Sequence, residues 1–286
     1  MSVNKINFNS DLAERDLSFY QSVDLPLIAQ INSANIGCLY HGGAEEVVQK
    51  ATQECHHQGV SIGAHISFLD KDNFGRTPMD WNEELIHSLI NEQFSILSNL
   101  KDPQISITHL KPHGALNNMA CKDPVLAQVI VSYVKQHYPE LIMLAPVLSE
   151  LAKASQAAGL VTALEIFADR TYEDDGTLTP RSIEGSLITD PSQATDHVKK
   201  MIEEKSIISR SGKKLPTTFH SICLGSSKSG THTRRTFARI PNTRWDPRNT
   251  SSSSPNTGEP SLTPSPSYLN SETPAETPCP VPPKSE

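Results

Sequence analysis

The strongest constraint on the fold is an alternation of short apolar runs with stretches of helical periodicity. Seven apolar runs occur, at positions 6–8, 31–38, 60–66, 105–110, 141–147, 160–167 and 219–224. Runs of this length suit buried strands, and the segments between them are mostly long enough to form helices. Because parallel strands are joined by crossovers that are usually helical, the pattern predicts a parallel α/β fold.

Helical faces and helix ends support this division. Two segments carry apolar residues at helical spacing, so each set is expected to share one buried face: Val47, Val48, Ala51 and Cys55 in the first, and Leu85, Ile86, Leu89, Ile90 and Leu97 in the second. The pairs Asp123-Pro124 and Asp190-Pro191 predict an N-cap followed by a proline in the first turn. Gly59 and Gly159 predict helix ends.

Composition and charge exclude several classes of protein. The chain has 286 residues, of which 36% are hydrophobic and 20% charged, with a formal net charge of −7. These values are typical of a globular protein. No run of 18 apolar residues predicts a membrane segment, and the amino terminus lacks the layout of a secretion signal, so we expect a cytoplasmic protein. The acidic balance argues against a nucleic-acid partner. Five scattered cysteines predict free thiols.

The composition changes sharply near residue 225. Residues 228–248 carry six basic residues and one acidic residue, and 26 of the 46 residues from 241 to 286 are Pro, Ser or Thr. Such a composition sustains neither helix nor sheet. The sequence therefore predicts one α/β domain over 1–225 and a basic, then Pro/Ser/Thr-rich, disordered tail over 226–286.

Polar side chains follow five of the seven apolar runs. In chain order they are Asn9, Asp11 and Glu14; Asn35 and His41; His65 and Asp70; Lys111, His113 and Asn118; and Glu165, Asp169 and Arg170. Ligands of parallel α/β folds bind at the carboxyl ends of strands. Contributions from so many strands favour a closed barrel, where all strand ends converge, over an open sheet.

Six motifs in this order resemble the LamB/YcsF lactam-utilisation family, which includes the A subunit of bacterial 5-oxoprolinase. They are SANIGC-x-x-HGG, GAH-x-x-x-x-D, FGR, KPHGAL, E-x-FADR and LTPRS, and the resemblance covers residues 6–224. It implies a seven-stranded TIM-like (β/α) barrel related to glycoside hydrolases and polysaccharide deacetylases. It also implies ATP-dependent opening of 5-oxoproline to glutamate, with ATP (and Mg) as cofactor and the B and C subunits of the enzyme as partners.

This chemistry gives the polar residues candidate roles. Opening a lactam needs an activated carbonyl oxygen, for example by phosphorylation, and then the attack of water. Cations and donors for the developing charge could come from His41, His65, Lys111, His113 or Arg170. Glu165 or Asp169 is the better candidate for the base, with Asp11 next. The amides Asn9, Asn35 and Asn118, together with Arg170, are expected to bind substrate.

Two alternatives remain open. One is a metal-dependent deacetylase or amidohydrolase that uses Asp11, His41, His65 and His113 around zinc, although their spacing on separate strands predicts no metal site by itself. The other is a truncated, inactive family member whose tail is merely appended or binds partners.

The sequence departs from the family pattern at several positions. Asn7 stands where the family has an acid, Ala13 and Leu39 where it has glycines, Ala44 where it has another acid, and Asn117 where it has tyrosine. After the last apolar run the family carries an HGD motif and a closing helix, which are replaced here by SSKSGTHTRRTF. The outer faces of the first and last strands are therefore expected to be exposed.

Overall fold

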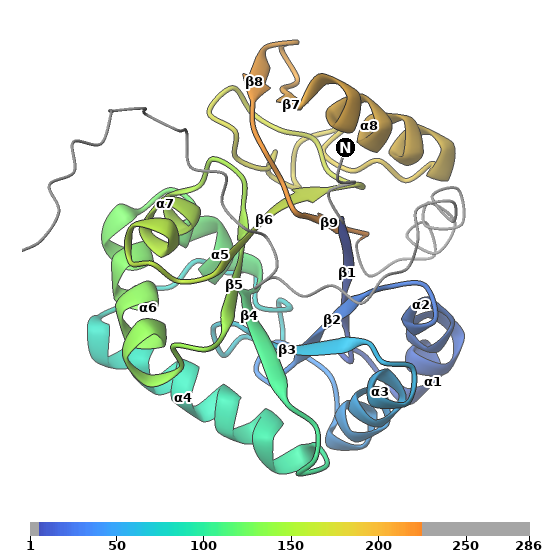
Figure 1. The fold of residues 1–286 in the computed structure, drawn as a ribbon, viewed down its shortest axis with the longest axis vertical. Helices are drawn as coiled ribbons and strands as arrows, with labels where there is room; N and C mark the ends of the chain where they lie inside the picture. The colour runs from blue at the N-terminus through green and yellow to red at the C-terminus, as the bar shows by residue number, and fades with distance from the viewer. Residues whose placement is uncertain (1–5, 225–286) are drawn as a thin grey trace, which may run out of the picture. The chain divides into compact units, whose positions relative to one another are not determined.

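The computed structural model describes residues 6–224, and these form a closed barrel of seven parallel strands (Figure 1). The strands are β1 (Asn7–Leu12), β2 (Ser33–Gly37), β3 (Ser61–Ile66), β4 (Ile107–Pro112), β5 (Ile142–Pro146), β6 (Thr162–Phe167) and β9 (Ser221–Cys223). Strand β9 pairs with both β1 and β6 and so closes the ring. The barrel predicted in place of an open sheet is confirmed.

Helices surround the barrel, as the view along its axis shows (Figure 1). They are α1 (Leu17–Phe19), the π-helical turn η1 (Tyr20–Asp24), α2 (Leu25–Ile28), α3 (Glu45–His57), α4 (Glu83–Leu100), α5 (Gly114–Ala120), α6 (Pro124–His137), α7 (Glu150–Ala157) and α8 (Pro191–Glu204). No helix among these described residues has the length and apolar character that a membrane crossing requires.

The predicted helix ends are correct. The Asp123 carboxylate accepts hydrogen bonds from the backbone N–H groups of Val125 and Leu126, and Asp190 caps α8 through Gln193. In both helices proline occupies the first turn, where a missing N–H costs nothing. Gly59 and Gly159 have φ values of +69° and +68°, a conformation that only glycine adopts without strain.

The main hydrophobic core lies between the outer face of the barrel and the helices. The predicted face of α3 is fully buried, and so are four of the five apolar residues predicted in α4. Leu85 is the exception and remains 43% exposed, because it lies at the edge of the buried face that Ile86, Ile90 and Leu97 form. The prediction that it shares the buried face was wrong.

Two further details differ from the sequence-based expectation. Strand β1 runs four residues beyond the predicted run, because its inward face is polar and the apolar pattern therefore ends early. A small antiparallel pair, β7 (Ser206–Ile208) with β8 (Lys214–Pro216), was not predicted, since each strand has only three residues.

The predicted tail and the substituted closing segment lie outside the described residues, so the domain boundary at 225 stays a prediction. The apolar side chains of Phe8 on β1 and Ile222 on β9 point away from the barrel interior and are 0% exposed. Both belong to the main hydrophobic core. The exposure expected for the outer faces of these two strands is therefore not found at these positions.

Candidate functional site

The interior of the barrel is polar. With the exception of Gly37, the inward-pointing residues of β1, β2 and β9 are amides, a carboxylate, hydroxyls and a thiol: Asn7, Asn9, Asp11, Ser33, Asn35, Ser221 and Cys223. The Asn9 side-chain amide donates to Ser221 Oγ at 2.8 Å and to Glu165 Oε1 at 2.6 Å. Asn35 Nδ2 donates to Asn9 Oδ1 and to Asp11 Oδ1, both at 2.8 Å. Two of the three amides predicted to bind substrate, Asn9 and Asn35, thus hydrogen-bond to charged groups of the barrel interior.

One glycine makes room for this network. A Cβ atom on Gly63 of β3 would lie 2.1 Å from the ring of His109 on β4, so the ring fills the space that a side chain would need. The ring is held by Asn35 Oδ1 at 3.0 Å from Nε2 and by Thr108 Oγ1 at 2.9 Å from Nδ1. His109 is therefore a structural residue of the barrel interior.

Lys111 on β4 lies at the centre of a buried group of charges, the Lys111 cluster, which comprises Lys111, Asp11 and Glu165. Lys111 Nζ donates to Asp11 Oδ1 at 3.0 Å and to Glu165 Oε1 at 3.2 Å. Nζ also lies 3.4 Å from the Cys223 sulfur. The three charged residues come from β4, β1 and β6, so closure of the barrel brings them together.

Burial and opposite charges compete in this cluster. Burial would lower the pKa of Lys111, but the carboxylates of Asp11 and Glu165 and the Cys223 thiol outweigh it and hold that pKa well above its usual value. Burial raises the pKa of Glu165 despite the neighbouring ammonium. Burial also opposes ionisation of Asp11, yet His65 and Lys111 keep the pKa of Asp11 well below its usual range. Lys111 is therefore a fixed cation rather than a base.

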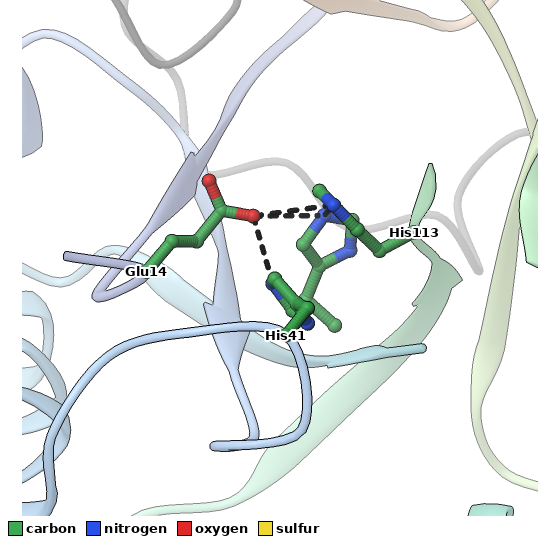
Figure 2. Close-up of side chains that lie close together, drawn as sticks. Glu14, His41 and His113 are labelled. Carbon is green, nitrogen blue, oxygen red and sulfur yellow. Dashed lines mark hydrogen bonds and ion pairs between the residues drawn. The ribbon is translucent and has the colours of Figure 1, made fainter. Parts of the chain in front are cut away.

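Four more side chains meet beside this group and form the histidine cluster: Glu14, His41, His65 and His113. Figure 2 shows His41 and His113 directed at the carboxylate of Glu14. The distances to Glu14 Oε1 are 3.0 Å from His41 Nε2, 3.2 Å from His113 Nδ1 and 3.5 Å from His65 Nε2. All four residues are at least nine-tenths buried.

The backbone turns after the strands aim these residues inward. His113 is the N-cap of α5, and the next residue, Gly114, has φ +54°. A Cβ atom on Gly114 would lie 2.2 Å from the Gly75 carbonyl oxygen, so only glycine fits this close approach. Glu14 follows Ala13, which has φ +61° and so turns the chain back over the end of β1.

The two clusters form one continuous site. His65 Nε2 lies 3.4 Å from Asp11 Oδ2, which joins the histidine cluster to the Lys111 cluster. Asp11 is also the most exposed carboxylate of the two clusters, since 18% of its side chain is accessible. Asp11 is therefore the carboxylate of this site that meets water.

The structure brings together most of the residues that the strand ends predicted. Asp11, His65, Lys111 and Glu165 lie on the barrel strands, and His41 and His113 lie on the loops that follow. Glu14 was noted at a strand end but given no role, although it contacts all three histidines. Asn118 is exposed on α5 and, within residues 6–224, forms no hydrogen bond with either cluster.

The predicted residues Asp169 and Arg170 follow β6 and lie near other arginines. Burial and the charge of Arg181 lower the pKa of Arg170 to about 10, and burial raises the pKa of Asp169. Arg170 is 7% exposed, donates to the Thr179 carbonyl oxygen at 2.6 Å, and has no hydrogen-bond partner for Nε. Arg76 also lies near Arg181, because burial and the positive charge of Arg181 together lower the pKa of Arg76.

Arg76 and Arg15 complete this group of cations, the arginine group (Arg15, Arg76, Arg170 and Arg181). The guanidinium carbons of Arg15 and Arg76 lie 5.1 and 4.8 Å from the centre of the same Phe74 ring. Across residues 6–224, no carboxylate lies within ion-pair distance of these four side chains. Unpaired guanidinium groups beside a polar site are suited to binding a carboxylate or a phosphate.

A separate cavity of about 590 Å³ lies at the opposite end of the barrel. It is lined by residues such as Asn32, Gln58 and Gln104, which precede β2, β3 and β4. It is distant from every charged group described above, and the amino-terminal end of such barrels usually serves stability. The candidate functional site is therefore the group of polar residues at the carboxyl ends of the strands.

Comparison with known proteins identifies the family of this chain. Residues 6–242 match the family model described as LamB/YcsF family. A protein of Azoarcus sp. (strain BH72) that is named as the A subunit of 5-oxoprolinase is 38% identical over 227 residues, which are 79% of this chain and 89% of the relative. The protein of the same name from Clostridium beijerinckii is 40% identical over 221 residues, or 77% of this chain and 87% of the relative.

A solved structure shows the same fold. The lactam utilization protein from Thermus thermophilus superposes with a TM-score of 0.73 and is 29% identical, and the match covers 82% of this chain and 96% of that protein. The motifs, the closed seven-stranded barrel and these similarities lead to one conclusion. The chain belongs to the LamB/YcsF family.

Proposed function

We propose that this chain opens the ring of 5-oxoproline, or of a closely related five-membered lactam, by hydrolysis of the ring amide bond. The observation that carries the proposal is the Lys111 cluster at the carboxyl end of the barrel, in a chain whose relatives are named as the A subunit of 5-oxoprolinase. A buried ammonium held between two carboxylates supplies a cation and a base within a few ångströms of each other.

The reaction needs both groups. Water adds to the lactam carbonyl carbon, the carbon–nitrogen bond breaks, and the ring nitrogen takes up a proton. Asp11, the carboxylate that meets water, takes a proton from the attacking water and returns it to the ring nitrogen. Lys111 stabilises the negative charge that develops on the carbonyl oxygen, and its raised pKa keeps it charged at neutral pH.

Other residues position these two groups. Glu165 accepts from both Lys111 and Asn9, so it fixes the direction of the ammonium. Asn35 donates to Asp11 and fixes the carboxylate. The histidine cluster lies beside Asp11, since His65 Nε2 is 3.4 Å from Asp11 Oδ2.

The arginine group is proposed to bind the anionic part of the substrate. The carboxylate of 5-oxoproline and any phosphoryl group are negatively charged, so they can pair with these four guanidinium groups, which have no carboxylate partner in the described chain. Among the described residues, Asp169 forms no ion pair with Arg170 or Arg181, but it lies near enough for their positive charges to favour its ionised form. Arg170 has the strongest claim, because its buried Nε–H has no partner within the described chain.

ATP dependence and an assembly of several different chains are part of the same proposal. An unstrained amide opens slowly, and transfer of a phosphoryl group from ATP to the carbonyl oxygen would make the carbonyl carbon more electrophilic. The relatives are named as one subunit of an enzyme, which supports partner chains that supply or share this activation. The cytoplasmic location stays a prediction.

The test is reconstitution. The purified chain is mixed with ATP, Mg²⁺, 5-oxoproline and the partner subunits of a bacterial relative, and glutamate and ADP are measured. We expect equal amounts of both products, and at least a hundredfold slower release with Lys111→Met. If the folded chain releases no glutamate where the Azoarcus protein does, the proposal is wrong, and the truncated, inactive alternative gains support.

A further inference from the structure

We propose that the histidine cluster is a binding site for a divalent transition-metal ion of the zinc class. Its four potential ligands come from four separate segments: the loops after β1 and β2, strand β3, and the N-cap of α5. One ligand atom from each of Glu14, His41, His65 and His113 lies within 4.8 Å of the others. The inference is independent of the lactam substrate, because it concerns only what these four side chains bind.

The hydrogen bonds on the outer side of each ring fix its tautomer. His65 Nδ1 lies 3.0 Å from the Lys111 carbonyl oxygen, and His113 Nε2 lies 3.0 Å from the Phe74 carbonyl oxygen. A carbonyl oxygen only accepts, so both of these ring nitrogens carry a proton. In a neutral imidazole the other nitrogen, which faces the cluster, then carries a lone pair.

The third ring is fixed in the same way through a hydroxyl group. His41 Nδ1 lies 2.8 Å from Ser67 Oγ, and Ser67 Oγ donates its only proton to the Phe68 carbonyl oxygen at 2.9 Å. Ser67 Oγ must therefore accept from His41 Nδ1–H, which leaves the lone pair on Nε2. An oxygen acceptor behind each ligating histidine is the usual outer shell of a protein metal site.

The inner atoms are all electron donors and lie too close together to be left without a cation. His65 Nε2 and His113 Nδ1 are 2.9 Å apart, and both face Glu14 Oε1. Lone pairs at this distance repel unless a proton or a metal ion lies between them. One divalent ion can contact all four buried donor atoms at once, whereas a proton can bridge only two of them.

The spacing fits a small tetrahedral ion. Zinc binds imidazole nitrogen and carboxylate oxygen at about 2.1 Å, so the ligands of a tetrahedral zinc ion are about 3.4 Å apart. The measured contacts among Glu14 and the three rings range from 2.9 to 3.5 Å. The other pairs of ligand atoms lie within 4.8 Å of each other, so only these distances need to shorten when an ion binds.

The ligand types select the class of metal. Three imidazoles and one carboxylate suit zinc and its neighbours among the transition metals, whereas magnesium and calcium prefer oxygen ligands. The carboxylate is Glu14, not the Asp11 that the deacetylase alternative assigned to zinc. Asp11 Oδ2 is 3.4 Å from His65 Nε2 and could accept a proton from a metal-bound water.

The experiment measures metal binding by the full chain, without lactam or ATP. The protein is purified, stripped with a chelator, checked for folding by circular dichroism, and titrated with Zn²⁺, Co²⁺ and Mg²⁺. We expect one Zn²⁺ per chain, a Co²⁺ complex with the visible absorption of four-coordinate cobalt, and a rise in melting temperature with zinc. Mg²⁺ is expected to compete weakly.

Matched variants locate the site. Glu14→Gln and His41→Gln should each weaken Zn²⁺ binding by roughly a hundredfold or more, and Ser67→Ala by about 10- to 100-fold. His109→Gln alters an equally buried histidine of the same barrel and should leave binding nearly unchanged. The proposal is overturned if the folded wild-type chain binds no stoichiometric zinc, if the Glu14 and His41 variants bind it normally, or if Mg²⁺ binds as tightly.

The result separates cleanly from the proposed function. If the chain binds one zinc ion but opens no lactam, the metal site is supported and the proposed lactam opening is wrong. If the chain opens the lactam but binds no zinc, the proposed function is supported and the metal site is wrong.

Discussion

Replacing Lys111 with methionine is the sharpest single perturbation of the Lys111 cluster. Nζ is 3.0 Å from Asp11 and 3.2 Å from Glu165, and Lys111 is 4% exposed. At an effective dielectric constant of about 20, each contact is worth roughly 5 kcal/mol of attraction, most of which offsets the cost of burying the charges. Removing only the cation leaves two buried carboxylates uncompensated, so we expect a loss of about 3–5 kcal/mol in unfolding free energy.

The assay is thermal unfolding at pH 8, followed by circular dichroism. For a domain of this size the loss corresponds to a fall of roughly 6–20 °C in melting temperature. Lys111→Met combined with Glu165→Gln should regain about 1–2 kcal/mol, because the second change removes one of the stranded charges. Lys153→Met is the matched control, since its exposed pair with Glu150 is worth less than about 1 kcal/mol. A Lys111→Met protein that melts with the wild type would refute this electrostatic account.

Four other changes test separate parts of the structure. Burial raises the pKa of Asp24 to about 7, so this carboxyl group binds its proton more tightly in the folded chain than in the unfolded chain. The stability that it contributes therefore falls as the pH rises from about 4 to 7. In denaturant titrations, the unfolding free energy of Asp24→Asn should exceed that of the wild type by about 1–3 kcal/mol at pH 8 and differ little from it at about pH 4. Ala13→Gly should stabilise the chain by about 0.5–1 kcal/mol, because φ +61° strains alanine, and an unchanged melting temperature would count against that strain. Gly63→Ala should destabilise by about 1–3 kcal/mol or more, since the added Cβ overlaps the His109 ring, and a normal melting temperature would show that the ring can move away. Asp11→Asn should lower kcat of the reconstituted reaction by about 10²- to 10⁴-fold with little change in KM, whereas a fall in both stability and substrate binding at constant kcat would assign it a structural role.

Much of the fold could be predicted because it depends on local patterns. The apolar runs marked all seven barrel strands, and the capping pairs at Asp123 and Asp190 marked two helix starts. The run at β1 marked only the start of the strand, because Asn9 and Asp11 point into a polar interior and interrupt the apolar pattern. No run marked the pair β7 and β8, because each of these strands has only three residues.

The candidate site could be predicted only in part. Polar residues at strand ends were expected to converge, because parallel strands end at one rim, and the structure places Asp11, His65, Lys111 and Glu165 together. The centre of the histidine cluster could not be predicted, since Glu14 reaches it through a turn at Ala13 with positive φ. The contacts of Glu14 with His41, His65 and His113 depend on the closed barrel, which brings together β3 and the segments that follow β2 and β4, and no spacing within the chain encodes them.

Two departures from the family pattern now have a physical meaning. Ala13 and Leu39 stand where the family resemblance leads us to expect glycine, and their φ values are +61° and +67°. These are conformations that glycine adopts freely and other residues adopt under strain. The substitutions therefore cost stability at the turns that carry Glu14 and His41 without displacing either side chain from the cluster.

The most direct test of the central claim is a crystal structure of the chain with 5-oxoproline bound. We predict that the ring amide lies at the carboxyl ends of the strands, with its carbonyl oxygen within hydrogen-bond distance of Lys111 Nζ and its carboxylate toward Arg170. A ring bound in the cavity beside Asn32 and Gln58, at the other end of the barrel, would contradict the account.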